Sequence, residues 1–260
     1  MTTIRQHLEL TYKISKDCQK HFVEKNQDEL IRFIFCGIQK VQKISKAFIS
    51  LYHHIEERED EEIEFSLGIL ARTLLMDMIL FLKIHNLRLT QKNDKKNMES
   101  EIRNFCYAVV IDGAWHYIKE IHYDDSINSD QKNKLYDKIN NLFPQAFDFS
   151  KNKPEIIIKT NVSLQGILKS CNKKELILKK DIEILYSFYS KYDHLNHFSS
   201  SIPSNLSFKK RKENLDFTIE MALVHLKDLL SLIKEFDIEY YVLSDYINEI
   251  NMTLNESYKY

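Results

Sequence analysis

Residues 61–86 read EEIEFSLGILARTLLMDMILFLKIHN. Wound as an α-helix, this stretch carries apolar side chains on nearly every face, and a helix of that kind packs at the centre of a bundle. We therefore expect it to form the core helix of the fold. The side chains that we expect to be buried are Leu67, Leu70, Leu74, Leu75, Ile79 and Leu82.

The apolar run from Phe65 to Ile84 within this helix is the one membrane-like stretch of the chain. It contains the charged residues Arg72, Asp77 and Lys83. Each charge in the middle of a membrane-spanning helix costs about 2.5–3.5 kcal/mol of insertion free energy. The charges therefore favour a helix inside a soluble protein, without membrane association.

Further helices are predicted on both sides of this one. In residues 30–51, apolar side chains recur at steps of three and four residues, with polar side chains between them, as in an amphipathic helix. The acidic block Glu56–Glu64 separates that helix from the core helix. The other predicted helices are Glu99–Tyr123, Ser129–Leu142, Ser163–Ser170, Lys174–Phe198, Asn214–Phe236 and Ile238–Tyr258.

Glycine and proline are scarce, with 4 and 3 among 260 residues. At average usage the chain would contain about 18 and 13. Sandwiches, barrels and doubly wound folds use both residues at tight turns and phosphate loops, so the deficit argues against all three. The prediction is a single all-α bundle of about seven to nine helices, with more than about 60% helix against a usual 30–35%.

Three segments are expected to be irregular. Residues 144–161 form a candidate hinge between 1–143 and 162–260 of the single domain 1–260, with Ile156–Ile158 extended. Gln91–Asn97 is a predicted loop. Ser199–Asn205, followed by the basic cluster Lys209–Lys212, is predicted to be a solvated linker.

The net charge and the cysteines indicate which cellular compartment and which binding partners the protein has. The 37 basic and 38 acidic residues leave a formal charge of −1, so no overall field steers the protein to nucleic acid or an anionic membrane. The polar N-terminus lacks a signal-peptide core. The cysteines, Cys18, Cys36, Cys106 and Cys171, form no Cys-x-x-Cys pair, and we expect Cys36 and Cys106 to be buried thiols. The chain is expected to be cytoplasmic, without disulfides.

Arg72 and Asp77 are the first candidate site residues. Neither charge can be buried without a partner, and five residues on a helix separate them by roughly 140°, so they face different neighbours. One interpretation is a pair of structural anchors. The other is an interior polar pocket lined by Arg72.

A second candidate lies on the helix that contains YSFYSKYDHLNH at residues 186–197. Tyr186, Ser190 and His194 follow one another at four-residue steps on one face, and Asp193 and His197 form a second such pair. These groups can bind a ligand or relay a proton, or they can form a hydrogen-bonded seam between helices. We expect the interior Arg72 to reach this face, because a buried guanidinium needs acceptors, with Asp193 as counter-charge.

Metal and cofactor motifs are missing. His194 with His197, or His53 and His54 with Glu57, could offer metal ligands, but the chain has neither Glu-x-x-His pairs nor His-Glu-x-x-His. Glycine-rich nucleotide loops and a Gly-x-Ser-x-Gly elbow are also absent. We expect no metal and no cofactor.

The Leu-Ala-Arg-Thr-Leu segment at 70–74, with Tyr-x-x-x-Ser-x-x-x-His at 186–194, resembles a bacterial all-helical family of unknown function. Its members pair an Arg-Ser/Thr helix with a late Tyr/Ser/His helix, and the resemblance covers residues 30–235. The family's acid four residues after the arginine is replaced here by Met76, with Asp77 one residue later. The resemblance implies a helical bundle with a polar interior.

A second comparison is with HEPN ribonucleases, helical proteins of bacterial defence systems. Their signature is an arginine followed by four to six residues and a histidine, and no arginine of this chain has it. An active site of this kind could still be formed by Arg72 and His194 together, from two separate helices. We expect a protein that acts by binding a partner protein or a small ligand, as an accessory or effector of antiviral defence. The alternative is a metal-independent ribonuclease.

Overall fold

The structure is a computed structural model of the whole chain. It describes residues 4–22, 29–58, 60–151, 153–158, 162–171, 178–190, 206–236 and 243–257. Of these described residues 84% are helical, in nine helices, which confirms the all-α prediction. The elements are α1 (Ile4–Phe22), α2 (Glu29–Arg58), α3 (Glu61–Thr90), α4 (Lys95–Tyr123), α5 (Ser129–Leu142), β1 (Phe147–Asp148), β2 (Glu155–Ile156), α6 (Leu164–Ser170), α7 (Lys179–Tyr189), α9 (Phe208–Glu235) and α10 (Leu243–Ser257).

Helix α3 is the centre of the bundle, as its sequence predicts. It contacts α2, α4, α6, α7 and α9. Five of the six side chains predicted to be buried are buried, and their residues are Leu67, Leu74, Leu75, Ile79 and Leu82. Leu70 is the exception, since it is half-buried at the edge of the core.

Helix α3 is joined to both neighbouring helices by short connections, of two residues from α2 and of four residues to α4. The carboxylate of Asp60 accepts hydrogen bonds from the backbone N–H groups of Glu62 and Ile63, so part of the acidic block serves as the N-cap of α3. At the other end, Asp94 caps α4 by accepting from the N–H of Asn97. The predicted loop 91–97 is therefore shorter than expected.

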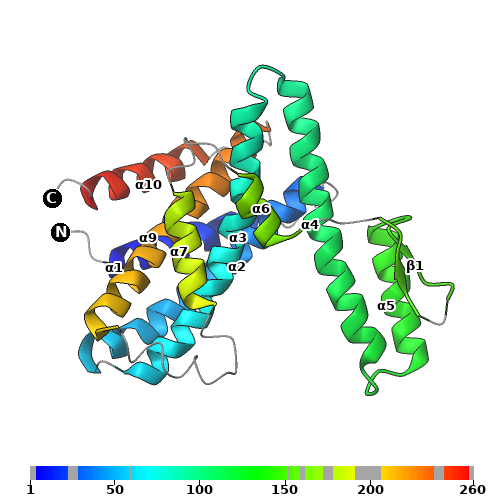
Figure 1. Cartoon of the computed structure of the whole chain (residues 1–260), viewed down its shortest axis with the longest axis horizontal. Helices are drawn as coiled ribbons and strands as arrows, with labels where there is room; N and C mark the ends of the chain where they lie inside the picture. Colours follow the sequence, from blue (N-terminus) through cyan, green and yellow to red (C-terminus); the bar gives the residue numbers. More distant parts are fainter. Residues whose placement is uncertain are drawn as a thin grey trace.

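Helix α4 belongs to two hydrophobic cores. Met98, Ile102 and Cys106 are buried in the main core, whereas Ile111, Ile118 and Ile121 are buried in a second core with α5 and β1. At about 100° per residue, the buried stripe turns by roughly 150° between the two triplets. In Figure 1, α5 and β1 accordingly lie beside the C-terminal half of α4, away from α1, α9 and α10.

The predicted irregular segment 144–161 forms part of this second core. β1 and β2 pair in antiparallel register, with Phe147 opposite Ile156, so only part of the expected extended run Ile156–Ile158 is a strand. The main core contains residues from both sides of the segment, from α2 and α3 as well as from α9. Residues 159–161 lie outside the described part of the chain.

Three features of the local structure differ from the expectations: one helix was not predicted, and two predictions are wrong. The N-terminal segment forms α1, which the sequence did not reveal, because its buried face carries polar His7, Thr11 and Ser15. The Thr11 hydroxyl donates to the carbonyl of His7 at 2.7 Å, so a polar side chain is satisfied within its own helix. Cys36 is exposed, although Cys106 is buried as expected.

The prediction that the basic cluster Lys209–Lys212 lies in a solvated linker is also wrong. The cluster is the first turn of α9, capped by the hydroxyl of Ser207, which accepts from the N–H of Lys210. Arg211 within it is buried. Residues 191–205, which include the rest of the predicted linker, are not described.

Among the described helices, α3 is long and apolar enough to cross a membrane by length and composition. Half of its most apolar window is buried against the rest of the protein. Core helices of soluble proteins pass the same test, so this is weak evidence for a span, and a soluble protein is plausible.

Candidate functional site

The structure brings Arg72 and Tyr186 together. The guanidinium carbon of Arg72 on α3 lies 5.9 Å from the ring centroid of Tyr186 on α7, and both residues are half-buried. At this separation the cation is attracted by the face of the ring. The contact joins the two helices that the sequence analysis selected.

The remaining residues of the predicted face are only partly described. Ser190 is the C-cap residue that follows α7. Its hydroxyl donates a hydrogen bond to the carbonyl of Ser187 at 2.9 Å. Asp193, His194 and His197 lie outside the described residues. The composite Arg72–His194 site therefore stays a hypothesis, and the expectation that His194 and His197 hold no metal stays untested.

Asp77 faces a different neighbour from Arg72, as its spacing predicts. The ammonium of Lys40 on α2 donates to Oδ1 of Asp77 at 2.8 Å. The Asp77 side chain is 12% exposed, whereas that of Lys40 is 51% exposed. The pair therefore spans from the interior to the surface. No sequence signal singled out Lys40, because it resembles the other lysines on the polar face of α2.

The Lys40–Asp77 pair lies in the wall of a cleft of about 700 Å³, which we call the α2–α4 cleft. Helices α2, α3 and α4 supply most of the wall, and α9 contributes His225 and Leu229. The apolar part of the wall includes Phe33, Met76, Leu80, Val109, Val110 and Leu229. The cleft combines a mostly apolar surface with few polar groups, as ligand sites do.

His225 is the most deeply buried polar residue of this wall, with 2% of its surface exposed. Phe81 packs edge-on against the imidazole at 5.4 Å between ring centroids. The Nε2 atom of His225 has no hydrogen-bond partner in the part of the chain that the structure describes. Burial lowers the pKa of His225 below its usual range, so the ring is neutral near pH 7.

His225 also lines a second cavity, the α3–α9 groove, of about 480 Å³. On that side Nε2 of His85 lies 3.1 Å from Oδ2 of Asp228. His225 thus separates two cavities, and each contains an aspartate that favours the protonated ring electrostatically. His225 was missed in the sequence, and the signal that could have found it is its position within the apolar run Ala222–Leu226.

Cys36 and Gly113 lie near the open side of the α2–α4 cleft. Partial desolvation raises the pKa of the Cys36 thiol, which disfavours the nucleophilic thiolate. A Cβ atom built at Gly113 would meet no heavy atom within 4 Å. A larger side chain at this residue of the cleft wall would therefore find open space beside its Cβ atom.

His53, His54 and Glu57, which the sequence analysis considered as possible metal ligands, do not form a cluster. His53 and Glu57 are exposed, and the two imidazole rings lie against each other at 3.8 Å between centroids. The described residues contain no group of three His, Cys, Asp or Glu side chains arranged to hold a metal ion.

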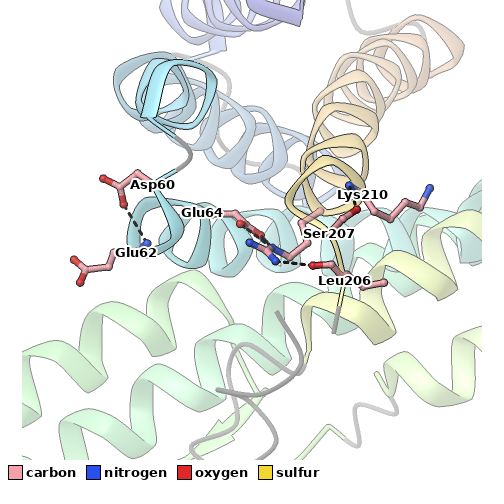
Figure 2. Close-up of polar contacts among 7 residues, drawn as sticks. Asp60, Glu62, Glu64, Leu206, Ser207 and Lys210 are labelled. Atoms are coloured by element: carbon pink, nitrogen blue, oxygen red, sulfur yellow. Dashed lines mark hydrogen bonds and ion pairs between the residues drawn. The ribbon is translucent and has the colours of Figure 1, made fainter. Parts of the chain in front are cut away.

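The basic cluster at the start of α9 is engaged by carboxylates. Arg211 binds Glu64, Lys212 binds Asp216 at 2.8 Å, and Lys210 binds Glu213 at 3.1 Å. Figure 2 shows Glu64 on α3 pointing toward the turn that contains Leu206 and Ser207. Because three of its four cations are paired, this cluster is a poor surface for nucleic-acid phosphates.

No protein-family model, curated protein or solved structure matches the chain. The function is accordingly argued from the geometry of these sites and from general chemistry.

Proposed function

We propose that this protein acts by binding a small, mainly apolar molecule in the α2–α4 cleft. The observation that carries the proposal is the cleft itself, whose volume of about 700 Å³ falls among those of small-molecule sites, about 300–1,000 Å³. Two thirds of the residues in its wall are apolar, and the polar ones are Cys36, Lys40, Asp77, Asp112, His116 and His225. An apolar wall supplies affinity, and isolated polar groups supply orientation.

The chemistry of the wall supports binding rather than catalysis. The raised pKa of Cys36 leaves the thiol protonated, so it is a weak nucleophile. The ammonium of Lys40 is held by Asp77, and a protonated amine is not a nucleophile either. We extend the proposal to a role in the bacterial cytoplasm, as an accessory or effector of antiviral defence, with the fold-level analogy to helical proteins of bacterial defence systems as its support.

A side chain placed in the open mouth of the cleft tests the proposal. Gly113→Phe adds an aromatic ring at a position where a Cβ atom meets nothing within 4 Å, so the fold has room for it. We expect the wild-type protein to bind Nile red with enhanced dye fluorescence, and Gly113→Phe to weaken that binding about tenfold or more, by steric exclusion.

Asn104→Phe is the matched control. Asn104 is exposed on the same helix and is not part of the cleft wall, so the added ring should leave dye binding unchanged. The proposal is wrong if the wild-type protein binds no dye, or if the two variants weaken binding equally.

One observation favours the ribonuclease alternative. Arg72 contacts Tyr186 on α7, the helix whose sequence continues toward His194. The guanidinium of Arg72 and the imidazole of His194, if they meet, could stabilise charge and transfer a proton during RNA cleavage. The test of this second candidate is given with the Arg72 variants in the Discussion.

A further inference from the structure

We infer that the ligand of the α2–α4 cleft carries an uncharged hydroxyl group, which donates a hydrogen bond to Asp77 and lies against His225. This inference rests on the proposed function and names the class of molecule that the cleft selects. Its ligand is an apolar body with one hydroxyl, such as an alkylphenol.

The first observation is the unequal use of the two Asp77 oxygens. Oδ1 accepts from Lys40 at 2.8 Å, whereas Oδ2 is buried and accepts from no group in the described residues. A buried carboxylate oxygen without a donor is strongly unfavourable, because it has lost its hydrogen bonds to water. A donor brought by a ligand would remove that penalty.

The second observation comes from another helix. His225 on α9 is 2% exposed, and its Nε2 also lacks a partner among the described residues. Both residues line the same cleft. The charge of Asp77 acts on the His225 ring, so the two side chains are near each other. Two unsatisfied polar atoms from α3 and α9, in a wall that is otherwise mostly apolar, therefore mark the place for a polar head group.

A hydroxyl fits these two atoms better than other head groups. It has one donor for Oδ2 of Asp77 and two lone pairs, one of which can accept from the N–H tautomer of His225. An ether has no donor. A phenol therefore satisfies both protein atoms, whereas its methyl ether leaves Oδ2 unsatisfied.

Charge disfavours ionised head groups. A carboxylate would be repelled by Asp77, and an ammonium would compete with the ammonium of Lys40 for the same aspartate. An uncharged donor leaves the Lys40–Asp77 pair intact. The cleft should therefore prefer a neutral molecule.

The test compares three probes of one shape, 4-octylphenol, 4-octylanisole and 4-octylbenzoate, by calorimetric titration or displacement of Nile red. We expect the phenol to bind wild-type protein about tenfold or more tightly than the anisole, which is the range of one hydrogen bond to a charged group. The benzoate should bind more weakly than the phenol.

Asp77→Asn should abolish this preference. The amide oxygen can still accept from Lys40, and the amide nitrogen then replaces Oδ2 with a donor, which suits the oxygen of either probe. We expect the phenol-to-anisole ratio to fall below about threefold. Glu62→Gln is the control, since Glu62 is an exposed carboxylate of the same helix outside the cleft, and it should leave the ratio unchanged.

The possible failures are distinguishable. If neither the phenol nor the anisole binds, the proposed function is wrong and this inference fails with it. If both bind wild-type protein equally, or the benzoate binds most tightly, the cleft is a ligand site but the hydroxyl inference is wrong. Retention of the preference in folded Asp77→Asn would also overturn it, since Asp77 would then not receive the donor.

Discussion

Glu64 and Arg211 form an ion pair inside the bundle, although 147 positions separate them in the chain. Nε of Arg211 lies 2.9 Å from both carboxylate oxygens of Glu64, and its Nη1 donates to the carbonyl of Leu206 at 2.7 Å. The side chain of Arg211 is 3% exposed and that of Glu64 is 6% exposed. The pair joins the first turn of α3 to the first turn of α9 (Figure 2).

Removal of one charge of this pair should destabilise the protein strongly. Glu64→Gln leaves the buried guanidinium without its counter-charge, so we expect the free energy of unfolding to fall by about 3–5 kcal/mol in urea titrations. Glu62→Gln, at an exposed position two residues away, should change it by less than about 0.5 kcal/mol. Equal effects of the two substitutions would contradict a stabilising role for the buried pair.

Joint replacement of both partners should be milder than loss of one. Glu64→Met combined with Arg211→Met removes both charges of this pair, and apolar replacements of buried pairs are often neutral or stabilising. We expect the double variant to be more stable than Glu64→Gln in the same titration. If it is less stable, packing of the two side chains matters more than their charge.

The core prediction concerns Leu74, which is 2% exposed on α3. Leu74→Ala should lower the free energy of unfolding by about 2–5 kcal/mol, through lost apolar burial and the cavity left behind. Leu70→Ala on the same helix should cost less, because Leu70 is only half-buried. An unchanged melting temperature for Leu74→Ala would contradict the central position of α3.

Variants of Arg72 distinguish a working pocket from a structural seam. If the site cleaves RNA, wild-type protein should degrade labelled total RNA in EDTA, and Arg72→Ala and His194→Ala should abolish cleavage. Arg72→Lys should rescue poorly, because an ammonium lacks the planar donor fork. If the contact with Tyr186 is only structural, Arg72→Ala should lower stability by about 0.5–2 kcal/mol and no RNA should be cleaved by any form.

Stability should fall as the pH drops below about 6.5. Burial lowers the pKa of His7 and of His225 in the folded protein, whereas in the unfolded chain each titrates near 6.5. Below that pH the unfolded state binds more protons, so the unfolding free energy decreases by at most about 1.4 kcal/mol per pH unit for each histidine. Full stability is present above about pH 7.5.

Urea titrations at pH 7.5, 6.5 and 5.5 measure this dependence. His225→Gln removes one of the two groups and should reduce the slope. A free energy of unfolding that is constant or rises toward pH 5.5 would show that these imidazoles are not held neutral by the fold.

The sequence by itself determined the fold class and the place of α3 at its centre. An all-round apolar helix has no stable position other than an interior one in water, and scarcity of glycine and proline left few folds other than a bundle. The separate directions of Arg72 and Asp77 followed from helix geometry alone, because positions on a helix are local properties.

Tertiary structure decided which residues meet. Lys40 and Arg211 look like ordinary surface cations in the sequence, and only the approach of α2 to α3 and of α9 to α3 provides Asp77 and Glu64 as their partners. Similarly, Cys36 has apolar sequence neighbours but faces an open cleft. Burial of a side chain depends on neighbours that are distant in the chain, and the local sequence pattern does not predict those contacts.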